Sequence, residues 1–257
     1  MGKEEIKDGM NGSLIRCNAI ISYLDEAGAT GVSEIAQELD RPKSSVHKYL
    51  KTLEFLEFVE NDGGVYRLGL RFLEIGGRIR NRNPIFQVAR PLADELANDI
   101  DEVIFISVKN GNYGVFVYQT NNRYGIENLA PLGERFYLHQ NAAGKAMLAE
   151  CSKNEIDQFI SKSNLPPAME KTTTDPNQLR TELNRIRDEG YSVGKGERFE
   201  GIRAISAAIP DGESGAIGAL SVVVPDSGPV ANKLESKSSE AVMRTANEIS
   251  LALKYDE

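Results

Sequence analysis

The stretch that decides the fold is "TGVSEIAQELDRPKSSVHKYLKTLEFLEFVENDGGVYRLG", Thr30–Gly69. Its apolar residues recur at helical spacing, which predicts a short helix over Val32–Leu39 and a second helix that ends near Leu56. Pro42 falls in the first turn of the second helix, where its missing N–H leaves no hydrogen bond unmade. The two helices are therefore joined by a turn at "DR".

A further helix precedes this stretch, and a hairpin closes it. Ser13 is a suitable N-cap and Gly28 a suitable stop for a helix over Leu14–Ala27. Two short β-prone runs, Phe58–Val59 and Val65–Leu68, flank the turn-forming "NDGG". Three helices followed by a hairpin are the order of elements in a winged helix-turn-helix, so the sequence predicts a DNA-binding domain over residues 1–76.

The helix after Pro42 carries a basic face in an acidic protein. The net charge of the chain is −8, yet no Asp or Glu lies between Arg41 and Lys51. Because Val46, Leu50 and Leu53 share one side, the opposite side faces solvent and can lie in a DNA major groove. The candidate DNA contacts are Arg41, Lys43, Ser44, Ser45, His47, Lys48 and Lys51, with Arg67 on the hairpin.

Two alternatives stay open. Taken alone, the basic face fits a solvated amphipathic helix equally well, and it is the preceding helix and the hairpin that favour DNA. A second class of function is a small-molecule-binding or enzymatic α+β domain whose helical N-terminus contacts only other proteins.

The rest of the chain predicts a linker and an α+β domain. Residues 70–100 predict a linker helix broken near Asn83-Pro84, with Arg78, Arg80 and Arg82 free of neighbouring acids. We place the linker helices at 77–100 and the second domain at 101–257. Strands are expected in "EVIFISVKNGNYGVFVYQT", Ile202–Ile209 and Ala216–Val224, and helices over Ala142–Glu150, Lys153–Ser161, Pro176–Glu189 and Pro229–Leu253.

Composition excludes several classes of protein. The two cysteines, Cys17 and Cys151, and the two histidines, His47 and His139, lack the spacing of a zinc site, so we expect no metal and no cofactor. A disulfide framework is equally unsupported, which favours the cytoplasm. No window approaches the apolar length of a membrane span, so we expect no membrane association.

Enzyme motifs are incomplete. The segment "NAAGKAMLAE" contains Gly-Lys, but a P-loop needs a glycine where His139 stands and Ser or Thr where Ala146 stands. His139 is the one histidine outside the DNA-binding region, and a buried structural role is favoured over a catalytic one. We therefore predict no catalytic residue.

These residues together resemble the IclR family of transcriptional regulators. The resemblance runs through Thr30–Gly76, through "LHQNAAGKAMLAE" and through "GYSVGKGERFEGIRAISAAIPDGESGAIGALSVVVP", and covers nearly the whole chain in order. It implies a winged helix-turn-helix, a linker helix and a GAF-like effector-binding domain, assembled as homodimers or dimers of dimers. It also implies a one-component regulator of catabolic or metabolic genes that binds a double-stranded DNA operator, more often a repressor than an activator.

The resemblance also implies an effector pocket, whose occupant in this family is often a small organic acid or an aromatic compound. This chain departs from the family at Ala204, Gly194 and Val223, where many members carry a Cys, an acid and a second Ser. Fewer polar side chains predict a smaller or more apolar effector, recognition through backbone N–H groups, or no response at all. The implied lining is Leu129, Leu132, Ala142, Ala143, Gly144, Gly194, Glu197, Phe199, Ala204 and Ser221.

Overall fold

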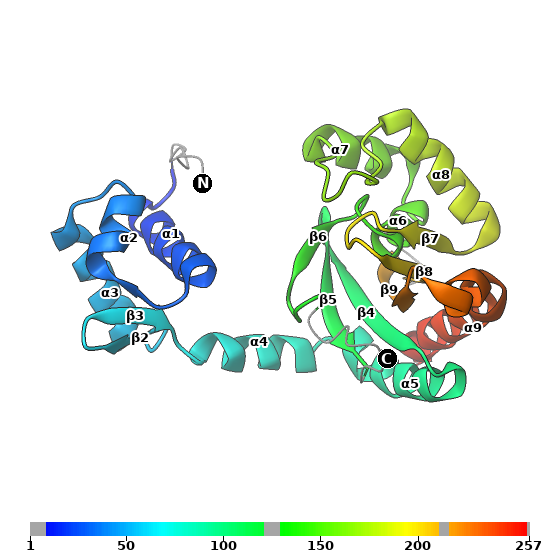
Figure 1. Cartoon of the computed structure of the whole chain (residues 1–257), viewed down its shortest axis with the longest axis horizontal. Helices are drawn as coiled ribbons and strands as arrows, with labels where there is room; N and C mark the ends of the chain where they lie inside the picture. Colours follow the sequence, from blue (N-terminus) through cyan, green and yellow to red (C-terminus); the bar gives the residue numbers. More distant parts are fainter. Residues whose placement is uncertain (1–8, 121–128, 211–215, 256–257) are drawn as a thin grey trace. The chain divides into compact units, whose positions relative to one another are not determined.

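The chain divides into two units, which we call the N-terminal unit, up to Ile79, and the C-terminal unit, from Arg80. The computed structural model describes residues 9–120, 129–210 and 216–255 (Figure 1). Among these residues, no helix is long and apolar enough to cross a membrane.

The N-terminal unit is a winged helix-turn-helix, as predicted. Its three strands are antiparallel in the order β1-β3-β2. Ile20, Ile35, Val46 and Leu50 are buried between the helices, and Tyr66 joins them from the hairpin. The elements are α1 (Gly12–Ala27), β1 (Thr30–Gly31), α2 (Val32–Glu38), α3 (Lys43–Phe55), β2 (Val59–Asp62) and β3 (Val65–Leu68).

Two helix starts differ from the prediction. The N-cap of α1 is Asn11 rather than Ser13, because the Asn11 side chain accepts the N–H of Ser13 at 2.9 Å. Pro42 is itself the N-cap residue of α3 and not part of its first turn. Gly28 ends α1 as predicted, at φ +72°, a conformation that glycine adopts without strain.

The linker region forms α4 (Arg71–Asn81) and α5 (Pro84–Ile100), with the break at the predicted position. Asn83 caps α5 by accepting the N–H of Phe86. The expectation that Arg78 has no acidic neighbour is wrong, because its guanidinium pairs with Glu74 at 2.8 Å, one helical turn away.

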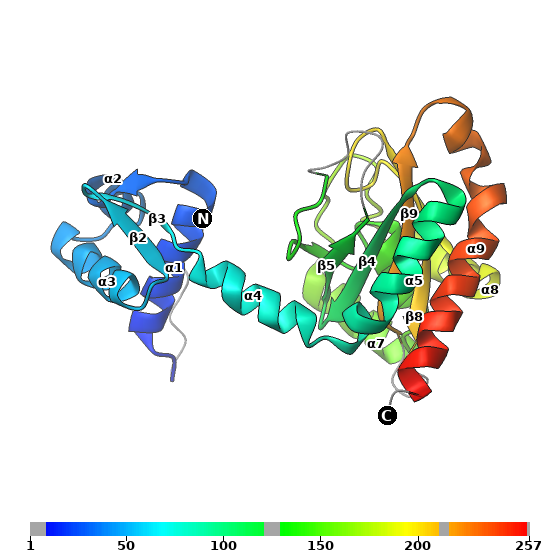
Figure 2. The same cartoon turned by 90° about the horizontal axis from the view of Figure 1, so that it is seen from below.

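The C-terminal unit is an antiparallel six-stranded sheet with helices on both faces, which confirms the predicted α+β class. Figure 2 shows α5 and α9 packed side by side on one face, and α6 contacts the other face through β8 and β9. The order is β6-β5-β4-β9-β8-β7. The strands are β4 (Val103–Asn110), β5 (Tyr113–Gln119), β6 (Arg135–Tyr137), β7 (Ser192–Lys195), β8 (Ile202–Pro210) and β9 (Ala216–Pro225). The helices are α6 (Ala142–Ala149), α7 (Lys153–Ser163), α8 (Pro176–Glu189) and α9 (Gly228–Tyr255).

Strand β4 lies in the interior of the sheet and is buried on both faces. Val103 and Phe105 belong to the apolar cluster under α6, whereas Ile104 and Ile106 belong to the cluster under α5 and α9. Successive side chains of a strand point to opposite faces, so a strand between two helix layers is almost continuously apolar. The two edge strands, β6 and β7, were not predicted from the sequence.

Candidate functional sites

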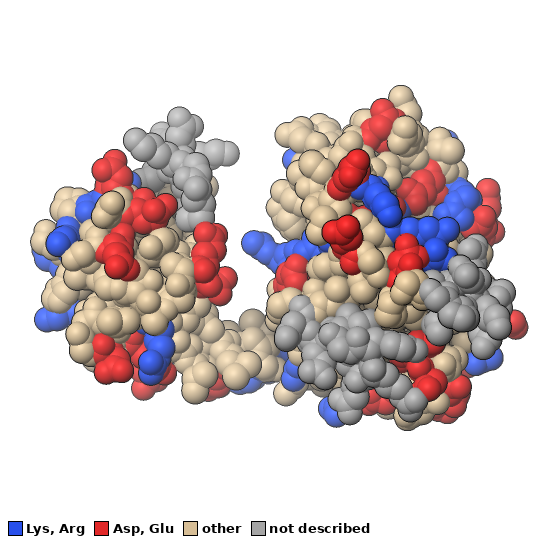
Figure 3. Space-filling model, in the orientation of Figure 1, with Lys and Arg blue, Asp and Glu red and all other residues tan. Residues whose placement is uncertain are grey.

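Helix α3 presents the predicted basic face to solvent. Lys43, Lys48 and Lys51 are exposed, and none of them has an acidic partner within ion-pair distance among the described residues. Figure 3 shows basic side chains at the α3 edge of the N-terminal unit. Arg41, Ser44 and His47 are also exposed, and Ser45 is half-buried.

The first turn of α3 is open to an anion. Pro42 supplies no side-chain cap, and the N–H groups of Ser45 and Val46 already donate to the Pro42 carbonyl. The N–H groups of Lys43 and Ser44 have no acceptor among the contacts of the described residues. Free N–H groups at a helix N-terminus favour a phosphate oxygen, which suits a helix that enters DNA by this end.

Arg67 on the hairpin is less available than the lysines of α3. It stands opposite Glu60 in the β2–β3 register, and its Nε donates to the Glu60 carboxylate at 2.9 Å. Both side chains are largely exposed, so the pair contributes little to stability. Its effect is to neutralise the one cation of the hairpin.

Replacing Glu60 with Gln is therefore expected to strengthen binding of duplex DNA about two- to fivefold, because it removes a charge that repels phosphate and frees Arg67. A mobility shift at low and moderate salt measures the change. Glu170→Gln makes the same charge change at an exposed position of the C-terminal unit and is the matched control. Equal gains from the two variants would show that only net charge matters.

Arg16 is a basic residue that the sequence analysis missed. It lies on α1, and its Nη1 donates to the Tyr49 hydroxyl on α3 at 3.3 Å. This hydrogen bond lowers the pKa of Tyr49. The contact places the cation of Arg16, on α1, beside α3. Because it joins residues far apart in the chain, the periodicity of the sequence does not predict it.

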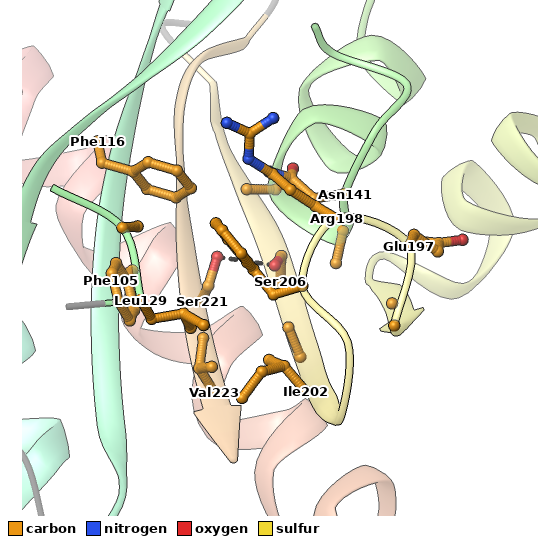
Figure 4. A pocket seen from close by; sticks show the side chains of 17 residues that line it. Phe105, Phe116, Leu129, Asn141, Glu197, Arg198, Ile202, Ser206, Ser221 and Val223 are labelled. Atoms are coloured by element: carbon orange, nitrogen blue, oxygen red, sulfur yellow. Dashed lines mark hydrogen bonds between the residues drawn. The ribbon is translucent and has the colours of Figure 1, made fainter. Parts of the chain in front are cut away.

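A cavity of about 50 Å³ lies in the C-terminal unit, between the sheet and the N-terminus of α6. Figure 4 shows its walls, which come from β4, β5, β8 and β9 and from the segment between β7 and β8. Its volume admits only a few non-hydrogen atoms. The lining residues are Phe105, Phe116, Leu129, Ala130, Asn141, Ala142, Ala143, Gly194, Gly196, Glu197, Arg198, Phe199, Ile202, Ala204, Ser206, Ser221 and Val223.

Two residues implied by the family resemblance lie elsewhere. Leu132 is 49% exposed and does not reach the cavity. Gly144 is buried in α6, and a Cβ there would overlap the carbonyl of Leu138, so this glycine serves close packing rather than ligand contact. The structure places the other eight in the lining, and with them several residues that the sequence analysis did not single out.

Arg198 is the most consequential of these additions. Its Nη1 donates to Gln140 at 3.0 Å, and its Nη2 donates to the Glu134 carboxylate and to the carbonyl of Arg135. Its Nε is buried and has no hydrogen-bond partner among the described residues. In Figure 4 the guanidinium and Asn141 lie at the same end of the cavity. A buried donor without an acceptor is costly, so this atom is suited to an anionic ligand.

The N-terminus of α6 adds further donors at the same end. Asn141 caps the helix by accepting the N–H of Gly144 at 2.8 Å. The N–H groups of Ala142 and Ala143 have no hydrogen-bond acceptor among the described residues. Gly194 keeps this place open, because a Cβ there would come within 3.2 Å of the Ala142 nitrogen.

Two serines meet on the sheet side of the cavity. Ser206 on β8 stands opposite Ser221 on β9, and its hydroxyl donates to the Ser221 Oγ at 2.7 Å. Both are buried. Because Ser221 accepts in this bond, its own hydroxyl proton is left to donate to a ligand.

A buried ion-pair triad supports the cavity wall. Lys145 on α6 is 0% exposed, and its Nζ lies 2.6 Å from Glu182 on α8 and 2.5 Å from Glu197. Burial raises the pKa of Glu197, and the Lys145 charge opposes that rise. The lysine therefore holds α6, α8 and the segment after β7 together, a structural role for the residue that first suggested a P-loop.

His139 is buried and shows no catalytic arrangement. Its Nε2 lies 3.0 Å from the Pro166 carbonyl, and burial lowers the pKa of His139, which keeps the ring neutral. Among the described residues, no group of three metal-ligating side chains comes together.

Comparison with known proteins identifies the family to which both units of the chain belong. Residues 13–63 match the family described as "IclR helix-turn-helix domain", and residues 78–251 match "Bacterial transcriptional regulator IclR C-terminal". The chain is 32% identical to the HTH-type transcriptional repressor AllR of Escherichia coli K12 over 94% of this chain and 90% of the relative.

Solved structures show the same fold over nearly the full length. IclR of Thermotoga maritima superposes with a TM-score of 0.76 at 26% identity, covering 94% of this chain and 98% of the other. An IclR homologue of Microbacterium hydrocarbonoxydans, crystallised in complex with 4-hydroxybenzoate, gives a TM-score of 0.77 at 25% identity and covers 95% and 99%.

Proposed function

The chain belongs to the IclR family of transcriptional regulators and is a DNA-binding regulator of metabolic genes rather than an enzyme, and from this premise we propose which of its surfaces perform that function. Helix α3 enters the major groove of the operator, with its first turn at base edges and Lys48 and Lys51 at phosphates. The observation that carries this proposal is the unpaired, acid-free face of α3. The chain acts as a repressor in the cytoplasm, where its operator lies.

The proposed operator is double-stranded and two-fold symmetric, because the chain acts as a homodimer or a dimer of dimers. Helix α4 supports this assembly, since none of its residues is buried and Leu73 and Ile79 are 72% and 67% exposed. Exposed apolar side chains on a helix favour a partner that covers them. Half-sites are then expected about 10 base pairs apart or at a multiple of that spacing. Sedimentation of the purified chain is the check.

The proposed effector is a small organic acid with a short apolar body. Support comes from the cavity of about 50 Å³, from the unpartnered Arg198 Nε and from the free N–H groups of Ala142 and Ala143. Phe105, Phe116 and the other apolar lining residues suit the rest of the molecule. The cavity is small for an aromatic acid such as the 4-hydroxybenzoate bound by the Microbacterium relative, so an aliphatic acid fits better.

Replacing Arg198 with Gln is expected to weaken binding of such an acid about 10- to 100-fold, because a charge-assisted hydrogen bond is lost. A thermal-shift screen of small monocarboxylates, followed by calorimetry on any that bind, measures this. The neutral amides of the same acids should bind the wild type and Arg198→Gln with equal affinity. Arg180→Gln removes an exposed guanidinium that pairs with Asp157 outside the cavity and serves as the control. Unchanged affinity in Arg198→Gln would contradict the assignment.

A further inference from the structure

A second, larger cavity lies in the C-terminal unit and shares no lining residue with the effector cavity. Its volume is about 580 Å³, which falls in the range of sites for drug-sized ligands. Its walls come from the start of α5, the end of β4, the turn after β4, the end of α6 and one side of α7. It is therefore a separate site and not an extension of the first.

One side of this second cavity is apolar. Leu138, Leu148 and Phe159 are buried members of the core that reach its surface, and Val108 and Ile85 complete this side. A flat ring system placed here would bury apolar area against an already ordered wall, so it would gain free energy without ordering the protein.

Positive charge outnumbers negative charge among the described residues that line the cavity. Lys109 comes from β4 and Lys162 from α7, against one carboxylate, Glu155. The Glu155 carboxylate is engaged with Ser152, whose N–H and hydroxyl donate to it at 2.8 and 2.7 Å in a capping box. The cavity is thus lined by two ammonium groups and by one carboxylate, and that carboxylate already accepts hydrogen bonds at the N-terminus of α7.

The ammonium groups lack acidic hydrogen-bond partners. The Lys109 Nζ contacts the Cys151 sulfur at 3.3 Å, and burial raises the pKa of Cys151, so the thiol stays neutral. Hydrogen bonds from Ser152 lower the pKa of the Glu155 carboxylate, and the nearby Lys109 charge lowers it further, but Glu155 forms no ion pair with Lys109 among the described residues. Lys162 has no hydrogen-bonded or ion-paired partner in the described part of the chain. A partly buried cation beside a thiol favours an incoming carboxylate more than a fully hydrated surface lysine does.

We propose that this second cavity binds an amphipathic carboxylate with a rigid ring system, separately from the effector of the first cavity. The carboxylate pairs with Lys109 and Lys162, and the rings lie on Leu138, Leu148 and Phe159. This proposal goes beyond the function proposed above, because it assigns a second ligand to the chain and does not depend on the first.

The position of the cavity also gives the ligand a regulatory effect. Asn83, Pro84 and Ile85 form one wall, and Asn81 is the last residue of the linker helix α4. A ligand bound there contacts the segment that joins α4 to α5. Because α4 leads to the DNA-binding unit along the chain, restricting this segment changes the conformations open to the linker and hence the affinity for the operator.

The test uses the full chain and 1-naphthoate as the probe, a two-ring carboxylate too bulky for the 50 Å³ cavity. Calorimetry should show binding to the wild type and to Arg198→Gln alike. The double variant Lys109→Gln/Lys162→Gln should bind about tenfold more weakly or worse. Gln158→Trp, which places an indole in the cavity from an exposed position on α7, should abolish binding.

Lys153→Gln is the matched control, since it removes the same charge from an exposed position on α7 outside the cavity. The proposal is wrong if the wild type does not bind 1-naphthoate, or if both cavity variants bind it as the wild type does. It is equally wrong if Arg198→Gln alone abolishes binding, because the probe then occupies the first cavity. A change of mass in sedimentation for Lys109→Gln/Lys162→Gln, without binding by the wild type, would show that a second copy of the chain covers the cavity instead.

Discussion

The double variant Lys48→Ala/Lys51→Ala is expected to lose on the order of 100-fold in affinity for the operator at moderate salt. Each lysine is exposed on α3, carries no acidic partner among the described residues and is proposed to contact a phosphate. A charge-assisted hydrogen bond contributes about 1.5–3 kcal/mol, so two lost contacts give about two orders of magnitude or more. A mobility shift on the DNA upstream of the gene measures the loss.

The salt dependence distinguishes lost contacts from a misfolded variant. Each phosphate contact removed should lower the slope of log K against log salt by roughly one unit. Lys153→Ala/Lys195→Ala makes the same charge change on exposed residues of the C-terminal unit and should leave both affinity and slope unchanged. If the α3 variant behaves like this control, α3 does not enter the groove. Failure of the wild type to bind random duplex DNA at low salt would instead favour a protein-interaction role for the N-terminal unit.

Replacing Lys145 with Met is expected to lower the free energy of unfolding of the C-terminal unit by about 3–5 kcal/mol. The lysine is fully buried between Glu182 and Glu197, so its loss leaves two neighbouring carboxylates without their counter-charge. Urea unfolding followed by circular dichroism measures the change. The exposed Lys153→Met on α7 is the control and should change stability little.

The loss should depend on pH with a defined sign. Burial already raises the folded-state pKa of Glu197, and removing Lys145 takes away the charge that opposes this rise. A carboxyl whose folded pKa lies above its unfolded value destabilises the fold when pH exceeds the folded pKa, and stability returns as pH falls through that pKa. Lys145→Met should therefore lose more at about pH 8 than at about pH 5.

The triple variant Lys145→Met/Glu182→Gln/Glu197→Gln tests the cause of the loss. With both carboxylates neutral, most of the stability should return, since replacing a buried ion pair as a whole is often nearly neutral. Recovery in the triple variant also keeps the test decisive if Lys145→Met does not fold. Equal stability of Lys145→Met and the wild type would contradict the role given to the triad.

The helices and central strands were predictable because their signals are local. The stripe of Val46, Leu50 and Leu53 repeats at helical spacing and is buried as that spacing requires. The start of α1 was not decided by the sequence, because Asn11 and Ser13 are both good N-caps and stand two residues apart. Strands β6 and β7 are short edge strands whose existence depends on pairing with β5 and β8, and no local pattern encodes that pairing.

The residues of the candidate sites also differ in whether a local sequence pattern predicts them. The face of α3 follows from periodicity and charge, so its residues could be named in advance. The role of Arg198 could not, because its guanidinium turns inward to meet Glu134 and Gln140, about 60 residues earlier in the chain. Lys145 was visible as part of a Gly-Lys motif, but its partners come from α8 and from the segment after β7, which only the tertiary fold brings to it.

Strand β4 has a mechanical consequence for signalling. Phe105 lines the cavity that we propose as the effector site, while its neighbours Ile104 and Ile106 pack beneath α5. The three residues are consecutive in one strand of a tightly packed sheet. A ligand that displaces the ring of Phe105 therefore also shifts Ile104 and Ile106, on which α5 packs. A ligand in this cavity and helix α5 would thus lie on opposite faces of one strand, so the backbone amide of Phe105 is the most direct reporter of ligand binding in this protein.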